Sequence, residues 1–287
     1  MTEFTAHQPI PDQASLRFAL VSGPPVARSG ESPVAYADRM GAWYVGERDD
    51  EHRKSHGLYL TPEPVAAFMA AMIEPKAEKL RLLDPAAGVG ILLCAAVEYL
   101  ATHPKRLRKI ELVACEIDAD LRGPLRLVLD HLVAWAAKRG VSVMPVIRQQ
   151  DFILANASAL DAEGDELFDA VIANPPYFKI NKNDPRALAA QSLVHGQPNI
   201  YALFMAISAA MLKAGGDFVF ITPRSFASGP YFRRFRERFF ELVRPVRTHV
   251  FGSRRETFSR DAVLQENVIL HAVRDDAWPT RRRYRKD

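Results

Sequence analysis

Cysteine is scarce in this chain, which has two among 287 residues. Cys94 and Cys115 each lie in an apolar segment without a second cysteine or a histidine at ligand spacing, so we expect buried core thiols and no metal site. The longest apolar runs, such as AAFMAAMI at 66–73, are far shorter than the roughly 20 residues that span a bilayer. The N-terminus is acidic and interrupted by proline, unlike a signal peptide. We therefore expect a cytoplasmic protein that does not enter a membrane.

The composition excludes a disordered or fibrous protein, because hydrophobic residues make up 48% and charged residues 25% of the chain. The net charge of +4 is unevenly distributed. Residues 1–178 contain 18 Lys and Arg against 24 Asp and Glu, and residues 179–287 contain 20 against 10, which gives −6 and +10. The second part favours a polyanionic partner. Its stretch FRRFRERFFE at 232–241, taken alone, is better explained as an amphipathic helix with solvated arginines.

The N-terminal region differs in pattern from the rest of the chain. Residues 1–54 contain clusters of Pro and Gly and no long periodic segment, so we expect an arm or a loosely packed cap. A regular pattern begins at residue 55. The sequence LYLTPEPVAAFMAAMI predicts a helix over about 62–73, with Thr61 as the N-cap residue and Pro62 in the first helical position.

Short apolar runs then alternate with helical patterns. The predicted strands are 80–84, 110–117, 141–149, 169–173, 217–222, 246–251 and 266–273, and the predicted helices are 89–101, 119–139, 199–213 and 230–242. This alternation predicts an α/β fold with a mostly parallel seven-stranded sheet and helices on both faces. The last run follows the sixth strand without room for a crossover helix, so we expect an antiparallel last strand.

In such a sheet, ligands bind at the carboxyl ends of the strands. The first strand ends in Asp84-Pro-Ala-Ala-Gly88-Val-Gly90, a turn that lets a ligand approach main-chain N–H groups at a helix N-terminus. The dinucleotide fingerprint would need glycine at position 93, where the chain has Leu93. This difference argues against a turn that binds a pyrophosphate. Glu116 ends the second strand, where a carboxylate can accept hydrogen bonds from both ribose hydroxyls.

The third strand ends in QQDF, which brings Asp151 and Phe152 to the same edge. Asp151 could accept a hydrogen bond from an adenine amino group while Phe152 lines the face of the ring. Structural alternatives exist, since Asp118 or Asp120 could cap the following helix and Phe152 could belong to the core. Together, the three strand ends predict a ligand with adenine, ribose and no phosphate, and S-adenosylmethionine is such a ligand.

In the segment VIANPPYFKI at 171–180, an apolar strand pattern is followed directly by an amide, two prolines and two aromatic residues. The simple explanation is an Asn-Pro turn that ends a strand, with Tyr177 as a surface ring. The order of motifs along the chain instead favours a functional role for this segment. The series GLYLTPEPVAAFM, LLDPAAGVG, ACEID, QQDF, ANPPY, NIYALFMAISAAMLKAGG, ITPRSF and AVLQENVIL, over about residues 55–274, resembles the gamma class of N6-adenine DNA methyltransferases from bacterial restriction-modification systems.

This resemblance implies a class I S-adenosylmethionine-dependent methyltransferase fold for residues 55–276 and methyl transfer to the N6 amino group of a flipped adenine in DNA. In the family, the Asn side-chain oxygen and the next Pro carbonyl accept hydrogen bonds from that amino group, which maps onto Asn174 and Pro175. Tyr177 would stack on the base. Phe258 falls where the family has a second aromatic residue that contacts the flipped base, although Phe258 could instead be a core residue.

The other family roles map onto the predicted cofactor pocket. By position, Thr61 would contact the methionine end, Asp84, Ala86 and Gly88 would line it, Glu116 would hold the ribose, Ile117 would pack on the adenine, Asp151 and Phe152 would complete the pocket, and Pro176 would lie near the cofactor.

The sequence differs from the family after the catalytic region. Gamma-class enzymes generally carry a target-recognition domain there, whereas only a basic tail, 277–287, remains here. We expect double-stranded DNA as the partner, with its sequence read by a separate specificity subunit or domain or by the N-terminal arm, or with no sequence choice because the chain is truncated. The connection 178–198, in which Lys179 and Lys182 could meet phosphates, is expected to become ordered on DNA. Methylation of another conjugated amine (a protein glutamine or an RNA base) and a catalytically silent DNA-binding subunit remain alternatives.

Overall fold

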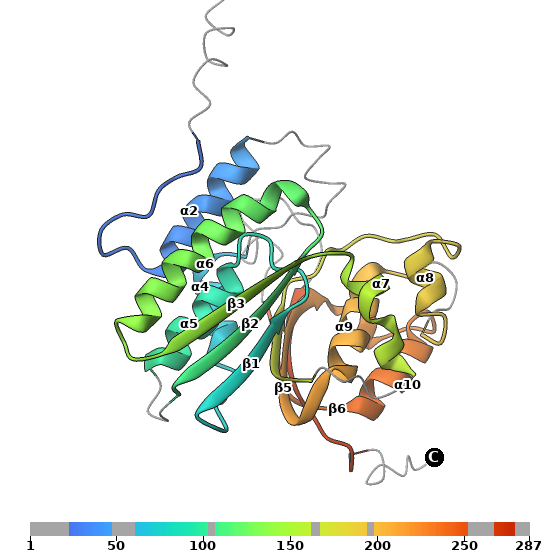
Figure 1. Cartoon of the computed structure of the whole chain (residues 1–287). Coiled ribbons are helices and arrows are strands. Elements are labelled where there is room, and N and C mark those ends of the chain that lie inside the picture. The colour runs from blue at the N-terminus through green and yellow to red at the C-terminus, as the bar shows by residue number, and fades with distance from the viewer. Residues whose placement is uncertain are drawn as a thin grey trace, which may run out of the picture.

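A computed structural model describes residues 23–47, 61–102, 107–161, 167–193, 198–251 and 267–278, and these residues form one seven-stranded sheet (Figure 1). The strands are β1 (Lys79–Asp84), β2 (Lys109–Glu116), β3 (Ser142–Gln149), β4 (Phe168–Ala173), β5 (Leu212–Pro223), β6 (Val243–Val250) and β7 (Asn267–Arg274). Their order across the sheet is β3-β2-β1-β4-β5-β7-β6.

Five neighbouring strands, from β3 to β5, pair in parallel, and β7 pairs antiparallel with both β5 and β6. The predicted mostly parallel sheet and the antiparallel last strand are therefore confirmed. β7 lies between β5 and β6, so the last strand is inserted into the sheet and β6 forms its edge. The carboxyl ends of the five parallel strands share one edge of the sheet.

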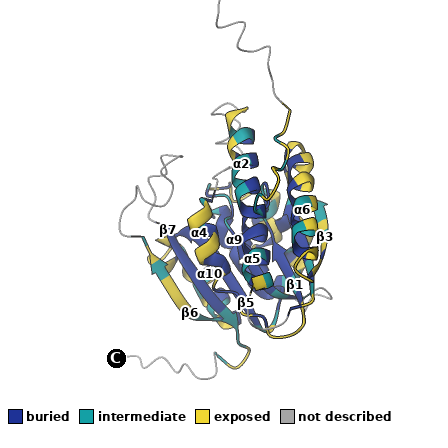
Figure 2. Ribbon diagram, turned by 90° about the vertical axis from the view of Figure 1, so that its left-hand side faces the viewer, coloured by how far each residue is buried: buried dark blue, intermediate teal, exposed yellow. Residues whose placement is uncertain are grey.

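Helices cover both faces of the sheet, as predicted (Figure 1). One face carries α2 (Pro33–Gly46), α4 (Glu63–Ala70), α5 (Ile91–Thr102) and α6 (Arg122–Ala137), and the other carries α7 (Phe152–Asn156), α8 (Pro185–Ala189), α9 (Ile200–Ala210) and α10 (Arg233–Leu242). Leu82 belongs to the first core and Leu83 to the second, and both are fully buried. Burial on both faces explains the unbroken apolar runs of the central strands, and Figure 2 shows these strands buried beside the exposed edge strand β6.

The start of α4 corrects one prediction. The helix begins at Glu63, its N-cap residue is Pro62, and no side chain caps it. Thr61 was expected to be the N-cap residue, which is wrong. Its buried hydroxyl instead accepts a hydrogen bond from the side chain of Asn174 at 3.0 Å. Thr61, which precedes the start of α4, therefore contacts the residue that follows β4.

α2 was not predicted, although part of the expected N-terminal arm or cap forms it. Ser32 caps the helix by accepting a hydrogen bond from the Ala35 N–H, and Pro33 follows in the first turn. Tyr36, Met40 and Tyr44, four residues apart, are all buried. Helical spacing places these three side chains on one face, which packs against the first core.

The two cysteines are buried core thiols, as predicted, and burial raises the pKa of Cys94 well above its ordinary value. Within the part of the chain that the structure describes, no helix is long and apolar enough to cross a membrane. The same residues contain no group of three or more His, Cys, Asp or Glu side chains that could hold a metal ion.

The turn after β1 yields a prediction for stability. Gly90 has φ of +88°, and a Cβ added there would lie 2.9 Å from Leu125 Cδ1 of α6. Gly140 has a similar φ of +77° but open space around its Cα. Both Gly→Ala variants force a left-handed residue, at about 1–2 kcal/mol. G90A also disturbs packing, so we expect it to lower the free energy of unfolding by about 1–3 kcal/mol more than G140A in urea titrations. Equal losses would show that this close approach is unimportant.

Candidate active site

Most residues predicted for the cofactor and the catalytic motif lie at or just after the carboxyl ends of β1 to β4, and Thr61 precedes the N-cap residue of α4. We call the set Thr61, Asp84, Glu116, Asp151, Asn174 and Tyr177 the strand-end site. In the sheet, β1 lies between β2 and β4, and β3 lies beyond β2. Parallel pairing therefore places these side chains along one edge in the order Asp151, Glu116, Asp84 and Asn174.

Glu116 is held by two main-chain donors. Its Oε2 accepts a hydrogen bond from the Gly88 N–H at 2.8 Å, and its Oε1 accepts one from the Asp118 N–H at 2.8 Å. Burial raises the pKa of Glu116 despite these bonds. Each carboxylate oxygen retains acceptor capacity, which suits a ligand with two hydroxyl donors.

The surroundings of Glu116 are open to a ligand. Gly88 has φ of +55°, and a Cβ added at this position would meet nothing within 4 Å. The neighbouring Ile117 is 52% exposed, which is unusual for a large apolar side chain directly after a buried strand. An apolar surface next to a fixed carboxylate fits the adenosyl part of S-adenosylmethionine.

Asp84 is an acid in an unfavourable position. It is 1% exposed, its Oδ1 accepts a hydrogen bond from the Ala86 N–H at 3.0 Å, and among the described residues its buried Oδ2 has no hydrogen-bond partner. Burial, with a smaller contribution from the charge of Glu116, raises the pKa of Asp84 to about 8. A cationic ligand would stabilise the ionised form, and S-adenosylmethionine carries cationic groups. The residues therefore fit this cofactor at both ends.

Asp151 and Phe152 reach the predicted edge but make contacts within the protein. Asp151 Oδ1 caps α7 by accepting from the Leu154 N–H at 3.0 Å, and its Oδ2 accepts from Arg186 Nε at 2.5 Å. Phe152 is buried and stacks on Phe204, with ring centroids 5.4 Å apart. The core alternative for Phe152 is thus observed, and its contact with adenine stays a prediction.

Asn174 is connected to two other elements. Its amide nitrogen donates to Thr61 Oγ1 at 3.0 Å, and its amide oxygen accepts from the Tyr177 hydroxyl at 2.5 Å. That hydroxyl also lies 2.8 Å from the main-chain oxygen of Ile221 in β5. Tyr177 is 8% exposed and packs edge-on against Tyr201, so it is not the surface ring of the simple alternative. These contacts join the start of α4 and the ends of β4 and β5.

Several site residues were missed or cannot be placed. Phe258 lies outside the described residues. Arg186 was missed, although Asp184 and Pro185 form a recognisable helix start, with the Asp184 side chain capping α8. Asp118 caps the turn after β2 by accepting from the Asp120 N–H, which was the structural alternative for this position. Lys179 and Lys182 are exposed, and their contact with phosphates stays a prediction.

The raised pKa of Asp84 predicts a pH dependence of stability. The folded protein retains the Asp84 proton up to about pH 8, whereas the unfolded chain releases it near 3.8. Stability from this group is complete below about pH 4 and is lost as the pH rises to about 8. We expect the isosteric D84N variant without cofactor to gain stability over the wild type on the order of 3–5 kcal/mol across this range. Chemical unfolding at several pH values measures the difference, and parallel pH curves would contradict it.

Comparisons with known proteins show which proteins this chain resembles. Residues 137–258 match the family described as Eco57I restriction-modification methylase. The chain is 33% identical over 229 residues to the type II methyltransferase M.PstI of Providencia stuartii, covering 79% of this chain and 45% of that protein. It is 31% identical over 235 residues to the type II methyltransferase M.BsuBI of Bacillus subtilis, covering 76% and 44%. The chain thus spans just under half the length of these relatives.

A solved structure supports the fold independently. A Listeria monocytogenes protein assigned to the class I S-adenosylmethionine-dependent methyltransferases superposes with a TM-score of 0.61 at 17% identity, covering 86% of this chain and 70% of that one. The predicted fold class and the resemblance to restriction-modification methyltransferases are therefore confirmed, and the residues described above fit S-adenosylmethionine as the cofactor. Residues 137–258 are thus similar to the Eco57I restriction-modification methylase family, and the sheet has the class I S-adenosylmethionine-dependent methyltransferase fold.

Proposed function

We propose that this chain methylates the N6 amino group of adenine in DNA. The observation that supports this most strongly is the position of Asn174, whose side chain is fixed between Thr61 and Tyr177 at the end of the strand next to Asp84. Residues 137–258 match a family described as a restriction-modification methylase, and the chain resembles type II methyltransferases, which makes DNA the favoured substrate.

The proposed chemistry depends on hydrogen-bond acceptors. The lone pair of an adenine amino group is delocalised into the ring, so the nitrogen is a poor nucleophile until its hydrogens are held. The Asn174 amide oxygen and the Pro175 carbonyl are the proposed acceptors, and the fixed φ of the prolines stiffens the turn that carries them. S-adenosylmethionine supplies an electrophilic methyl group. Neutral Asn174 is not a general base, so the extra proton leaves the amine for solvent after transfer.

Tyr177 is the proposed stacking partner of the flipped base. Its hydroxyl lies within hydrogen-bond distance of Asn174 and the Ile221 carbonyl, which fixes the ring beside the amide. Stacking on an aromatic ring contributes about 1–3 kcal/mol and offsets part of the cost of removing a base from the duplex. Pro176, which is half-buried, completes the motif next to the cofactor.

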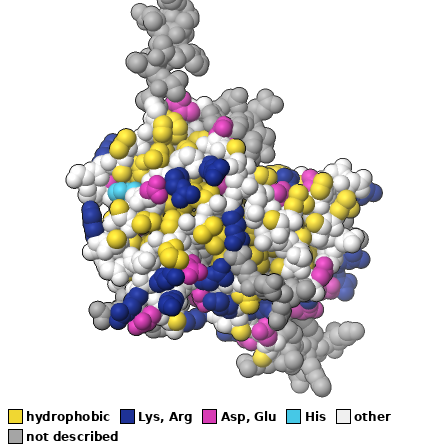
Figure 3. Space-filling model, viewed as in Figure 1, with side chains coloured by type: hydrophobic (Ala, Val, Ile, Leu, Met, Phe, Trp, Pro, Cys, Tyr) yellow, Lys and Arg dark blue, Asp and Glu magenta, His cyan; other side chains and the backbone are white. Residues whose placement is uncertain are grey.

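The basic part of the chain is the proposed surface for the DNA backbone. Figure 3 shows Lys and Arg side chains on the side of the molecule that carries α8 and α10, mixed with other side-chain types. Not all are available for phosphates, since Arg236 donates to the carbonyls of Phe226 and Ser228. Arg233 and Arg234 are exposed. Such contacts give affinity without sequence choice, so we propose that a separate specificity subunit or domain reads the DNA sequence.

Methyl transfer to DNA is the direct test. The full chain is incubated with labelled S-adenosylmethionine and genomic DNA that lacks N6-methyladenine, and the nucleosides are then analysed. We expect labelled N6-methyl-2′-deoxyadenosine. Label in protein or RNA supplied in parallel reactions, with none in DNA, would favour another conjugated amine as substrate, and cofactor binding without any transfer would favour a silent binding subunit. If no transfer occurs, the assay is repeated with candidate specificity subunits before the chain is concluded to be a silent binding subunit.

Two variants separate the proposed roles. N174A removes the acceptor and should abolish transfer while cofactor affinity, measured by calorimetry, changes little. E116A removes a charged hydrogen-bond acceptor and should weaken cofactor binding by about tenfold or more. Equal loss of binding in both variants would contradict the assignment.

Thr61 yields a further prediction, because its hydroxyl fixes the Asn174 amide. T61V keeps the side-chain shape but leaves the Asn174 donor without this acceptor, so we expect a roughly tenfold lower transfer rate. T61S retains the hydroxyl and serves as the matched control, with most of the rate kept. Transfer at the wild-type rate by T61V would exclude a role for this contact.

A further inference from the structure

Tyr44 makes a contact that neither the sequence motifs nor the proposed chemistry explains. It lies in the last turn of α2, is 2% exposed, and donates its hydroxyl hydrogen to Asp118 Oδ2 at 2.6 Å. The two residues are 74 positions apart. Asp118 is also buried, and a hydrogen bond to a carboxylate is roughly twice as strong as one between neutral groups.

Asp118 in turn contacts the carboxylate that is proposed to hold the cofactor ribose. Its main-chain N–H donates to Glu116 Oε1 at 2.8 Å, and its Oδ1 accepts from the Asp120 N–H at 2.9 Å. The Asp118 side chain is therefore held at both oxygens, by Tyr44 and by Asp120. Because this side chain fixes the backbone just after β2, it also fixes the direction of the N–H that holds Glu116. Two hydrogen bonds in series thus connect α2 to Glu116.

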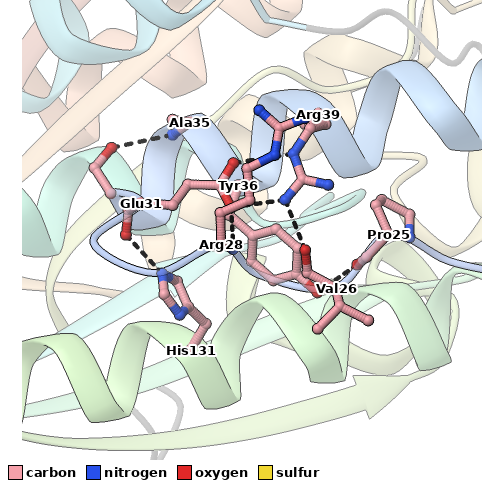
Figure 4. A network of polar contacts seen from close by, with 9 residues as sticks. Pro25, Val26, Arg28, Glu31, Ala35, Tyr36, Arg39 and His131 are labelled. Carbon is pink, nitrogen blue, oxygen red and sulfur yellow. Dashed lines mark hydrogen bonds and ion pairs between the residues drawn. The ribbon is translucent and has the colours of Figure 1, made fainter.

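Contacts at its N-terminal end hold α2 in place, so the hydrogen bond from Tyr44 can fix the position of the Asp118 side chain. Figure 4 shows the polar network at its start, in which Glu31 accepts from Arg39 and the Glu31 carbonyl lies 2.9 Å from His131 Nε2 of α6. A second anchor comes from α5, where Glu98 accepts from the Val34 N–H at 2.7 Å. The helix is therefore fixed to α5 and α6 at one end, and Tyr44 lies at the other.

We infer that Tyr44 is a positioning residue for the cofactor site, which acts through Asp118 to hold Glu116 in the orientation that binds the ribose. This inference rests on the proposed role of Glu116. It assigns to the N-terminal helix a part in cofactor affinity and none in the chemical step.

The chain offers a matched control on the same helix. Tyr36 is also 2% exposed, and its hydroxyl donates to the Pro25 carbonyl at 2.8 Å (Figure 4). Y44F and Y36F each remove one buried hydroxyl from α2. Only Y44F removes the bond to Asp118.

The test measures S-adenosylmethionine and S-adenosylhomocysteine binding to the full chain by calorimetry, together with the unfolding midpoint of each variant. We expect Y44F to raise both dissociation constants by about tenfold and Y36F to change them less than about twofold. In methyl-transfer assays, Y44F should raise KM for the cofactor and leave kcat unchanged. Equal weakening by both variants, or a fall in kcat alone, would overturn the inference. Binding is measured without DNA, so a failure of the proposed DNA methylation would leave this result readable.

D118N provides a second route if Y44F fails to fold. An asparagine at this position leaves one acceptor oxygen for two donors, so we expect weaker cofactor binding than in the wild type. In the folded variants, Y44F and D118N combined should weaken binding by less than the product of their separate effects, because they break the same connection. Wild-type affinity in D118N, or fully independent effects, would overturn the inference.

Discussion

The parallel pairing of β3, β2, β1, β4 and β5 is the constraint on which the site depends. It brings the ends of these strands to one edge, although their residues are far apart in the sequence. Three of these strand ends carry polar side chains of the site: Glu116, which is the proposed acceptor for the ribose hydroxyls, the buried acid Asp84, and the amide Asn174 that follows β4. A single antiparallel strand among them would send its polar end to the opposite edge. The inserted β7 lies beyond β5, where this order is not disturbed.

The site combines fixed acceptors with acids that are poorly stabilised in the protein alone. Main-chain N–H groups from Gly88 and Asp118 hold Glu116, yet burial still raises its pKa. Burial also raises the pKa of Asp84, to about 8, and one of its oxygens has no partner among the described residues. Without a ligand Asp84 therefore stays neutral up to about pH 8, and a cationic cofactor would favour its ionised form.

The sequence predicted the sheet well, because strands buried on both faces require unbroken apolar runs and parallel strands require helices between them. It predicted the strand-end residues for the same reason, since polar residues stand out directly after such runs. It did not predict α2, whose three buried aromatic and Met side chains are spaced by four in a segment preceded by Pro and Gly clusters. Thr61 was misassigned because a threonine before proline is an equally good helix cap and hydrogen-bond acceptor for a distant amide. Contacts such as those of Tyr44 with Asp118 and Arg186 with Asp151 depend on tertiary packing, and no local pattern reveals them.

The proposed function requires Glu116 and Asn174 to face one ligand site at the carboxyl edge of the sheet, and a crystal structure of the full chain with S-adenosylhomocysteine would show whether they do. We expect the ribose hydroxyls within hydrogen-bond distance of the Glu116 carboxylate, with the sulfur directed toward the Asn174 amide. A ligand bound elsewhere, or an Asn174 side chain turned away from the sulfur, would contradict it.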